Sequence, residues 1–407
     1  MSTPTRDPEE SARPRRIVGV CRGEAAGPLL LVIASLHGNE PAGTNAVRRV
    51  LARLARGRIP LRGDLIGISG NLAALGRGRR FVDEDMNRIW QPDRVASILE
   101  SIHSGTADQL PARMVGSVEL AEQRELLVAL RAELATARGP VHVIDLHTTS
   151  SESAPFTTLG DTLQNRELAL ELPLPAVLGL EEQLDGAMLQ YLDVLGWRSI
   201  GIEGGAHGNP ASVVAHEDAL WLLLTALDMV SPQGVPDLGE RRERLAEAAR
   251  GLPRVADVRY RHQIAETDGF VMEPGFRNFD PVKKGQALAT DRNGVVVAPE
   301  SGLLFLPLYQ KQGDDGFFVV RSVHPAWLGV SRWLRRSGID RFATWLPGVI
   351  ELPDRDDTVL LASWAANRVT IGILHLLGYN VQREGGRVFM VRRAETAIEG
   401  SALNLGR

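Results

Sequence analysis

Apolar residues in the first half of the chain alternate between short continuous runs and helical spacings. Residues 29–36 are almost entirely apolar, which is typical of a buried strand. Residues 40–56 carry apolar side chains at the spacing of one helix face. The same two patterns predict further strands at 64–69, 141–146 and 198–202, and further helices at 118–138 and 215–230. Strands that alternate with helices predict an α/β fold, in which a mixed sheet is flanked by helices over residues 17–230.

The pattern changes twice beyond this α/β region. Residues 231–254 begin with prolines and glycines and continue into a charged helical stretch, which predicts a linker with a short helix. Residues 255–325 show short strands between glycine and proline turns, which predicts a small all-β appendage similar to a barrel-sandwich. Residues 326–407 carry helical patterns at 327–337 and 358–377, followed by strand patterns. They predict a C-terminal α+β extension whose role stays open.

The composition excludes several classes of protein. Of 407 residues, 44% are hydrophobic and 24% are charged, with a net charge of −4. These values are ordinary for a globular protein and provide no polybasic surface for nucleic acid or membranes. The single cysteine, Cys21, excludes an internal disulfide framework and a cysteine-rich zinc site. No stretch of about eighteen apolar residues is present, so we expect no membrane span and a cytoplasmic location.

Both ends of the chain have a distinct character. Residues 1–16 are polar and charged, which predicts a disordered tail. In the C-terminal extension, helices, a hairpin and arginines are compatible with a winged-helix-like DNA reader. An accessory or dimerisation module is the favoured alternative because the net charge is negative and Asp354, Asp356 and Asp357 lie within the extension. We therefore expect no nucleic-acid partner, and a homo-oligomer is possible.

Polar side chains with metal-binding chemistry follow two of the predicted strands. His37 and Glu40 come directly after residues 29–36, and His147 ends the strand that begins at Val141. Imidazole nitrogens and carboxylate oxygens are ligands that zinc accepts, and catalytic zinc commonly has three protein ligands. Asp145 lies two residues before His147, so it shares a side of the strand with it and is a candidate to orient that histidine. A capped or solvated strand end is an equally good interpretation of Asp145.

Together with two later segments, these residues resemble the motifs of the succinylglutamate desuccinylase/aspartoacylase family, a branch of the zinc carboxypeptidase-like hydrolases. The motifs present here are H-G-N-E at 37–40, R-x-x-D-x-D-x-N-R at 80–88, D-L-H at 145–147 and a strand-end E-x-G at 203–205. All four occur in the family's order, and the resemblance covers roughly residues 28–325. It implies a zinc-carboxypeptidase-like α/β domain followed by a β appendage.

The resemblance implies a role for each matching residue. His37, Glu40 and His147 match the ligands of one Zn²⁺ per chain. Glu203 matches the general base that accepts a proton from the attacking water, and Arg80 matches the arginine that stabilises the oxyanion. Arg80 follows Arg77 and Arg79, and any of the three is also a candidate for a solvated loop charge, so only its position within the motif selects Arg80.

The same motif implies a substrate anchor. Asn87 and Arg88 match the pair that grips the substrate's carboxylate, a task suited to a planar guanidinium. Asp85 is expected to brace Arg80 and Arg88. His207 follows the E-x-G motif where the family often continues differently, which leaves substrate specificity open. A polar loop residue is the favoured interpretation of His207, and a site residue is the alternative.

These expectations favour a zinc-dependent hydrolase that cleaves the amide bond of a small N-acyl amino acid. A metallocarboxypeptidase acting on short peptides would use the same residues, and the discriminator is whether the β appendage narrows the cleft. A non-catalytic binding or regulatory protein that uses its C-terminal extension is the alternative from another class. The complete set of candidate ligands together with Glu203 argues against it.

Overall fold

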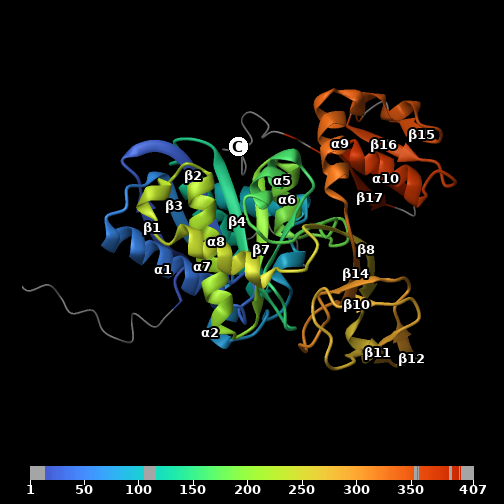
Figure 1. Ribbon diagram of the computed structural model, residues 1–407, viewed down its shortest axis with the longest axis horizontal. Coiled ribbons are helices and arrows are strands. Elements are labelled where there is room, and N and C mark those ends of the chain that lie inside the picture. The colour runs from blue at the N-terminus through green and yellow to red at the C-terminus, as the bar shows by residue number, and fades with distance from the viewer. Residues whose placement is uncertain are drawn as a thin grey trace, which may run out of the picture.

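The computed structural model describes residues 14–104, 116–352, 355, 357–384, 387–393 and 395. Figure 1 shows an α/β unit coloured blue to yellow-green, a small all-β unit in gold and an α+β unit in orange and red. The predicted fold class is therefore confirmed. Most of the expected disordered tail, residues 1–13, lies outside the described residues. Arg16, at its end, belongs to the fold, because its guanidinium donates to the backbone oxygen of Ser69 (2.7 Å) and pairs with Glu122.

One mixed sheet of eleven strands runs through the α/β unit and continues into the all-β unit, in the order β1-β3-β2-β4-β7-β5-β6-β8-β14-β13-β10. The strands of the α/β unit are β1 (Ile17–Arg22), β2 (Ala25–Ala34), β3 (Arg62–Ser69), β4 (Val141–Thr149), β5 (Phe156–Leu159), β6 (Ala176–Leu178) and β7 (Arg198–Ala206). The neighbours β3, β2, β4 and β7 are parallel, so their carboxyl ends meet at one edge of the sheet. That edge carries the candidate site.

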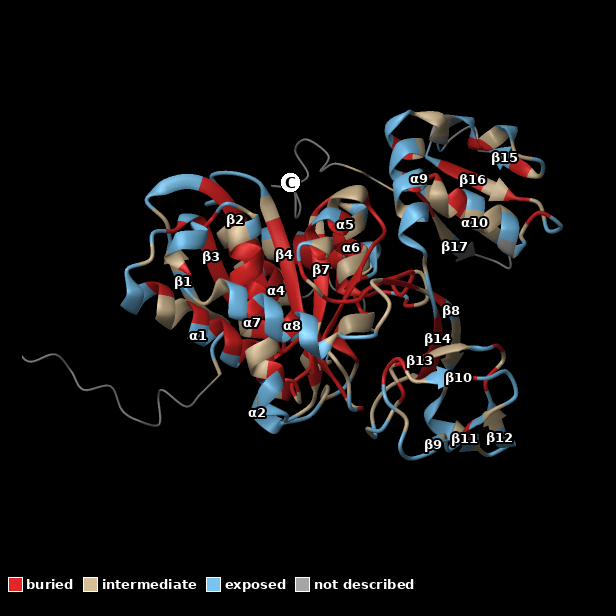
Figure 2. Ribbon diagram, viewed as in Figure 1, coloured by how far each residue is buried: buried red, intermediate tan, exposed pale blue. Residues whose placement is uncertain are grey.

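Helices cover both faces of this sheet, as Figure 2 shows by the buried strands between them. The helices of the unit are α1 (Ala42–Gly57), α2 (Leu72–Arg77), α3 (Pro92–Ser104), α4 (Val118–Leu134), α5 (Leu163–Leu170), α6 (Met188–Val194), α7 (Pro210–Ala226) and α8 (Leu238–Ala248). Strand β2 divides its apolar side chains between the two faces. Leu30 and Val32 pack with α1 and α7, whereas Leu31 and Ile33 pack with α3 and α4. A continuous apolar run is what a strand buried on both faces requires.

The all-β unit is joined to the sheet through β8 (Val255–Gln263), which pairs in parallel with β6. The other strands of this unit are β9 (Val271–Met272), β10 (Pro281–Val282), β11 (Ala287–Asp291), β12 (Gly294–Val297), β13 (Gly302–Phe305) and β14 (Asp315–Ser322). Strands β12, β11 and β9 form a separate small sheet. Because β8 and β14 extend the main sheet, the turns of the appendage lie close to the α/β unit.

The C-terminal unit contains α9 (Pro325–Arg336), α10 (Arg368–Leu376) and the four-stranded sheet β15-β16-β18-β17. Its strands are β15 (Val349–Glu351), β16 (Thr358–Leu361), β17 (Tyr379–Glu384) and β18 (Arg387–Arg392). The expected helix at 358–377 is wrong in its first part, because β16 pairs with β15 and β18. A short apolar run that contains β-branched residues is stabilised as a strand once neighbours are present. Within the described part of the chain, no helix is long and apolar enough to cross a membrane.

Candidate metal centre and catalytic cavity

The turn between β2 and α1 presents His37 and Glu40 at the carboxyl edge of the sheet. Backbone contacts hold the turn, with Gly38 N donating to Arg80 O (3.1 Å) and Glu40 N donating to His37 O (3.2 Å). Gly38 is required there, because a Cβ would lie 2.0 Å from the backbone of Ala74. The His-Gly-Asn-Glu sequence therefore folds into a turn that directs its first and last side chains toward β4.

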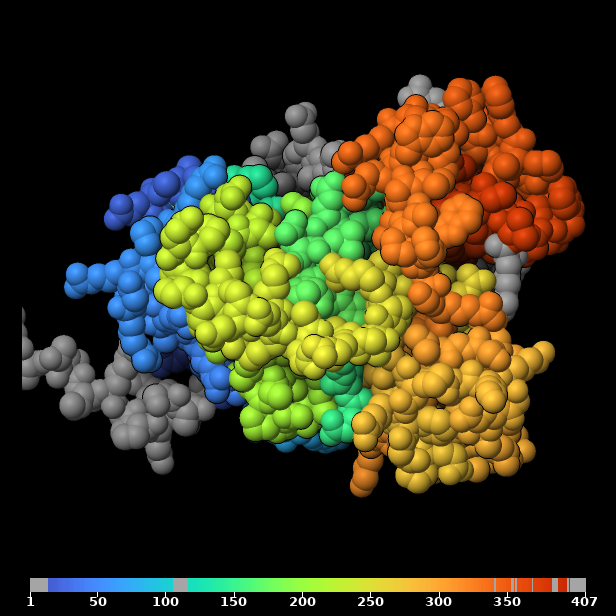
Figure 3. Space-filling model, in the orientation of Figure 1, coloured from blue at the N-terminus to red at the C-terminus, as the bar shows by residue number. Residues whose placement is uncertain are grey.

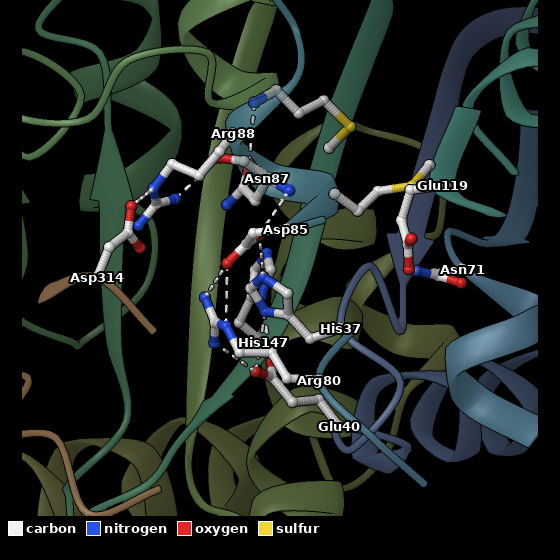
Figure 4. A network of polar contacts seen from close by, with 12 residues as sticks. His37, Glu40, Asn71, Arg80, Asp85, Asn87, Arg88, Glu119, His147 and Asp314 are labelled. Atoms are coloured by element: carbon white, nitrogen blue, oxygen red, sulfur yellow. Dashed lines mark hydrogen bonds and ion pairs between the residues drawn. The ribbon is translucent and has the colours of Figure 1, made fainter. Parts of the chain in front are cut away.

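His37, Glu40 and His147 converge into a cluster whose ligand atoms all lie within 4.8 Å of one another. Oε1 of Glu40 lies 3.0 Å from Nδ1 of His37, and Oε2 lies 3.1 Å from Nδ1 of His147. Figure 4 shows the three side chains pointing toward one another from the turn and from β4. Bonds of about 2.0–2.2 Å to a tetrahedral zinc place its ligand atoms a little over 3 Å apart, so this donor set fits the ion.

Two carboxylates orient the two imidazoles from behind. Asp145 Oδ2 lies 2.7 Å from Nε2 of His147, and Asp85 Oδ1 lies 3.1 Å from Nε2 of His37. In each histidine the Nδ1 atom is left directed toward Glu40. Histidines that bind a metal through one ring nitrogen commonly have the other nitrogen held by a carboxylate in this way. Strand alternation anticipated the first of these contacts, whereas the second joins residues 48 positions apart.

The charges in the cluster shift its pKa values strongly. Burial alone would raise the pKa of Glu40, but His37 and His147 hold it well below the usual range. Burial alone would lower the pKa of His147, but Asp145 and Glu40 raise it well above the usual range. Glu40 is thus an anion beside a protonated His147, and a cation that binds here would displace the proton of that imidazole.

Glu203 lies on β7 directly opposite His147 in the parallel pairing of β4 and β7. Its Oε2 atom is buried and has no hydrogen-bond partner among the described residues. Burial raises the pKa of this carboxyl to about 8, the His147 charge opposes that rise, and the Glu40 and Asp145 charges add to it. A buried carboxyl with a free oxygen beside a metal-ligand cluster is suited to accepting a proton.

The segment 80–88 carries the predicted arginines into the same cavity. Arg80 donates from Nε to Oδ2 of Asp85 (3.0 Å), and its NH1 lies 3.7 Å from Oε1 of Glu40. Asp85 also accepts from the backbone N of Asn87 (2.8 Å). Asp85 therefore fixes both the arginine and the turn that follows it.

Arg88 and Asn87 make contacts that the sequence did not suggest. Arg88 donates from NH2 to Oδ2 of Asp315 (2.6 Å), and Oδ2 of Asp314 lies 3.7 Å from its Nε. Asp315 begins β14 in the all-β unit and Asp314 directly precedes it, and Figure 4 shows Asp314 facing Arg88. The side chain of Asn87 accepts from the backbone N of Met188 (2.9 Å), at the start of α6. Asn87 thus supports α6, and Arg88 already has acidic partners.

Glu119 is a structural residue of the site that sequence reasoning missed. It is fully buried in the first turn of α4 and accepts from the backbone N atoms of Val82 (2.7 Å) and Asp83 (2.9 Å). It also accepts from the side chain of Asn71 (3.1 Å), as Figure 4 shows. The one available signal was an acidic residue in the first turn of a helix, which is too common to single out.

The cavity at the cluster has a volume of about 140 Å³. Besides the residues above, the appendage contributes Leu306, Pro307, Leu308, Gln310 and Gly313 to its lining. The appendage thus forms part of the cavity wall, where it bears on the choice between small amides and peptides as substrates. His207 borders this region, where its Nδ1 lies 2.7 Å from Thr148 Oγ1 and its Nε2 lies 3.2 Å from Gln310.

Comparisons with known proteins agree on one family. Residues 26–211 match the model of the succinylglutamate desuccinylase/aspartoacylase catalytic domain. The succinylglutamate desuccinylase of Pseudomonas putida (strain GB-1) is 33% identical over 87 residues, which are 21% of this chain and 26% of that protein. The corresponding enzyme of Burkholderia lata is 34% identical over 89 residues, 22% of this chain and 25% of that protein. The match therefore spans about a quarter of the length of these relatives.

Solved structures share the fold at low sequence identity. The succinylglutamate desuccinylase/aspartoacylase of Rhodobacter sphaeroides has a TM-score of 0.51 and 17% identity, covering 75% of this chain and 88% of that one. The product-bound ectoine utilization protein of Ruegeria pomeroyi has a TM-score of 0.51 and 19% identity, covering 74% and 88%. At such identities the likeness concerns the fold alone.

Proposed function

We propose that this chain, whose residues 26–211 belong to the succinylglutamate desuccinylase/aspartoacylase catalytic-domain family, is a zinc-dependent deacylase. Its substrate would be an N-acyl amino acid or a similar small amide that bears a carboxylate. The observation that carries the proposal is the convergence of His37, Glu40 and His147 with Glu203 and Arg80 around one cavity.

The donor set supports zinc as the metal. Two imidazole nitrogens and one carboxylate, each imidazole backed by a further carboxylate, are the ligands of a catalytic zinc with an open position. A zinc ion bound there supplies a Lewis acid that polarises a carbonyl and makes water more acidic.

The chain's own residues would then move the proton and stabilise charge. Glu203 would accept a proton from the attacking water at its free Oε2 and return it to the leaving nitrogen. Arg80, held by Asp85 at the cavity wall, would stabilise the negative charge that develops on the carbonyl oxygen. Both groups are positioned before the substrate arrives, so little reorganisation accompanies the reaction.

Arg88 would anchor the substrate's carboxylate at the opposite side of the cavity. Its NH2 is held by Asp315, which is itself paired with Arg261, so the guanidinium has a fixed orientation. Asp314 is the loosely held neighbour, because its side chain is 44% exposed and lies 3.7 Å from Arg88. A substrate carboxylate would displace Asp314 rather than Asp315.

The proposal is tested by metal analysis followed by a hydrolysis screen. The screen compares acetyl-, succinyl- and formyl-amino acids with short peptides, each as the free acid and as the carboxamide. We expect about one zinc per chain, and turnover of acyl-amino acids in the acid form only. Absence of zinc, or a preference for peptides, would contradict the proposal.

A further inference from the structure

The cavity has a second wall away from the metal-ligand cluster. Gly160, at the end of β5, and Glu181, just after β6, both line it. Strand β5 runs antiparallel to β7 with Phe156 opposite Glu203, so Gly160 lies four residues further along the strand. At the rise of an extended strand, Gly160 lies about 13 Å along β5 from Phe156, the residue opposite Glu203. Because β5 and β6 are parallel neighbours, the two segments leave the sheet side by side.

Arg335 of the C-terminal unit holds the first of these segments. Its NH2 donates to Oδ2 of Asp161 (2.8 Å) and its NH1 to the backbone O of Asp161 (2.5 Å), the residue directly after Gly160. The side chain of Arg335 is 2% exposed. Glu395 extends the contact by accepting from the backbone N of Leu163 (2.7 Å), at the start of α5.

Arg393 of the same unit holds the second segment. Its NH2 donates to Oε1 of Glu182 (2.6 Å) and lies 3.1 Å from Oε1 of Glu181. His375 lies 3.1 Å from the other oxygen of Glu182. In the described structure neither oxygen of Glu181 accepts a hydrogen bond, so this ion pair is its main polar contact.

These contacts join ionisable side chains that are buried, and burial shifts their pKa values. Burial raises the pKa of Glu181 to about 8, and the Arg393 charge opposes that rise. Burial would raise the pKa of Asp161 too, but Arg335 and Arg166 hold it far below the usual range. Glu182 stays charged, because His375 and Arg393 lower its pKa against the effect of burial. Removing Arg335 or Arg393 would leave the buried charge of Asp161 or Glu182 without its arginine, so each segment depends on its arginine for its position.

We propose that the C-terminal unit, through Arg335 and Arg393, positions the far wall of the catalytic cavity and thereby determines which substrates fit. Figure 3 shows the orange surface of this unit directly against the green segment that carries the wall. The two arginines are positioning residues, since they act through Asp161, Glu181 and Glu182 and lie behind the cavity. The inference rests on the proposed function, because it concerns the specificity of the same site.

The test uses the full-length chain with the substitutions Arg335→Met, Arg393→Met and Arg393→Lys. Arg336→Met is the matched control, because Arg336 crosses the same interface but pairs with Glu167 at its surface, where its side chain is 62% exposed. Hydrogen exchange of residues 157–166 and 176–186 should become about tenfold faster in the methionine variants. The control should exchange like the native chain, and Arg393→Lys should fall between them because one ammonium cannot reproduce the forked contacts.

Activity and metal content separate positioning from a general loss of structure. For the best substrate of the hydrolysis screen, KM should rise about tenfold in the methionine variants while kcat changes less than about threefold. Zinc content should stay unchanged. Faster exchange across the whole chain, or faster local exchange with native KM, would overturn the inference. Should Arg393→Met fail to fold, native KM in Arg393→Lys and Arg335→Met would overturn it equally.

The inference and the proposed function fail in different ways. If the native chain hydrolyses nothing in the screen, the proposed function falls, and the exchange data alone decide whether the arginines hold the wall. If the native chain is active and the variants keep both native exchange and native KM, only the inference falls.

Discussion

At the scale of single residues, the metal cluster depends on two histidines that share one carboxylate. His37→Ala and His147→Ala each remove one of three candidate ligands. We expect about one zinc per native chain and less than about a tenth of that in either variant, because a catalytic site has few ligands to spare. Elemental analysis of purified protein measures this. His103→Ala, at an exposed position in α3, should keep the native content, and full occupancy in both cluster variants would refute the ligand assignment.

Glu203 is the residue whose chemistry is easiest to isolate. Glu203→Gln keeps the shape of the side chain but cannot accept a proton, so turnover should fall about 10²–10⁴-fold. Zinc content and thermal stability should change little. Steady-state kinetics of Glu203→Gln beside Glu152→Gln, an exposed acid beyond β4, measure the effect. Turnover within about threefold of native in Glu203→Gln would assign the base elsewhere.

We expect substitutions of Arg88 and of Asp314 to change substrate affinity in opposite directions. Arg88→Lys loses the planar fork and should lower kcat/KM for carboxylate substrates by about 30-fold. Asp314→Asn removes a negative charge that lies 3.7 Å from Arg88, so it should lower KM for the same substrates about threefold. Kinetics with paired acids and carboxamides measure both effects, and the amides should respond little. A higher KM in Asp314→Asn would mean that Asp314 contacts a cationic part of the substrate.

At the scale of elements, the site depends on how closely α1 packs against β4. A Cβ on Gly43 would lie 2.6 Å from the Cβ of Leu146, the residue before His147. Gly43→Ala should therefore push the helix from the strand and destabilise the fold by about 1–3 kcal/mol. Gly239→Ala in α8 is the matched control, since nothing lies within 4 Å of its added Cβ, and it should stabilise by about 0.4–1 kcal/mol. Urea unfolding compares the two, and equal effects would contradict the packing argument.

The pairing of strands explains why a helix was predicted correctly in only part of residues 358–377. The residues from Thr358 to Leu361 carry an apolar pattern that suits a strand or a buried helix turn equally well. The segment forms a strand because it pairs with β15 and β18. The helix α10 begins only after Asn367, whose side chain accepts a hydrogen bond from the backbone N of Val369 (3.0 Å). One strand partner precedes the segment in the sequence and the other follows it, so the pattern within the segment does not predict the pairing.

At the scale of the whole molecule, the buried acids beneath the C-terminal unit predict how stability depends on pH. Burial raises the pKa of Asp193 to about 7, although Arg393 and hydrogen bonds from Asn165 and Ser199 oppose the rise. In the unfolded chain this carboxyl has its ordinary, lower pKa, so the unfolded state loses its proton first as pH rises. The contribution of Asp193 to stability is thus fully present below about pH 4 and is lost as the pH rises through about 7.

Asp193→Asn should remove that dependence. The variant should gain stability relative to the native chain at pH 8, on the order of 1–2 kcal/mol, and should gain little at pH 5. Urea unfolding at the two pH values measures the difference. The same gain at both values would show that the Asp193 carboxyl stays charged in the folded chain.

The sequence alone determined the α/β fold class and the residues that form the candidate metal cluster. His37, Glu40, His147 and Glu203 each follow or end an apolar strand, and parallel strands place their carboxyl ends at one edge of a sheet. Asp145 was found because alternation along a strand is a local rule with a period of two. Local periodicity and one topological rule pointed to His37, Glu40 and His147, whereas Glu203 was selected only by its match to the strand-end motif of the family.

Only the tertiary structure decided the partners of the charged side chains. Glu119 supports the segment 80–88, Asp315 holds Arg88 from a different unit, and Arg393 reaches Glu181 from more than 200 residues away. In the sequence each of these residues has the character of a solvated charge. Burial turns them into structural groups, because a charge removed from water is stable only beside its partner. That partner is selected by the packing of whole units, which no local pattern encodes.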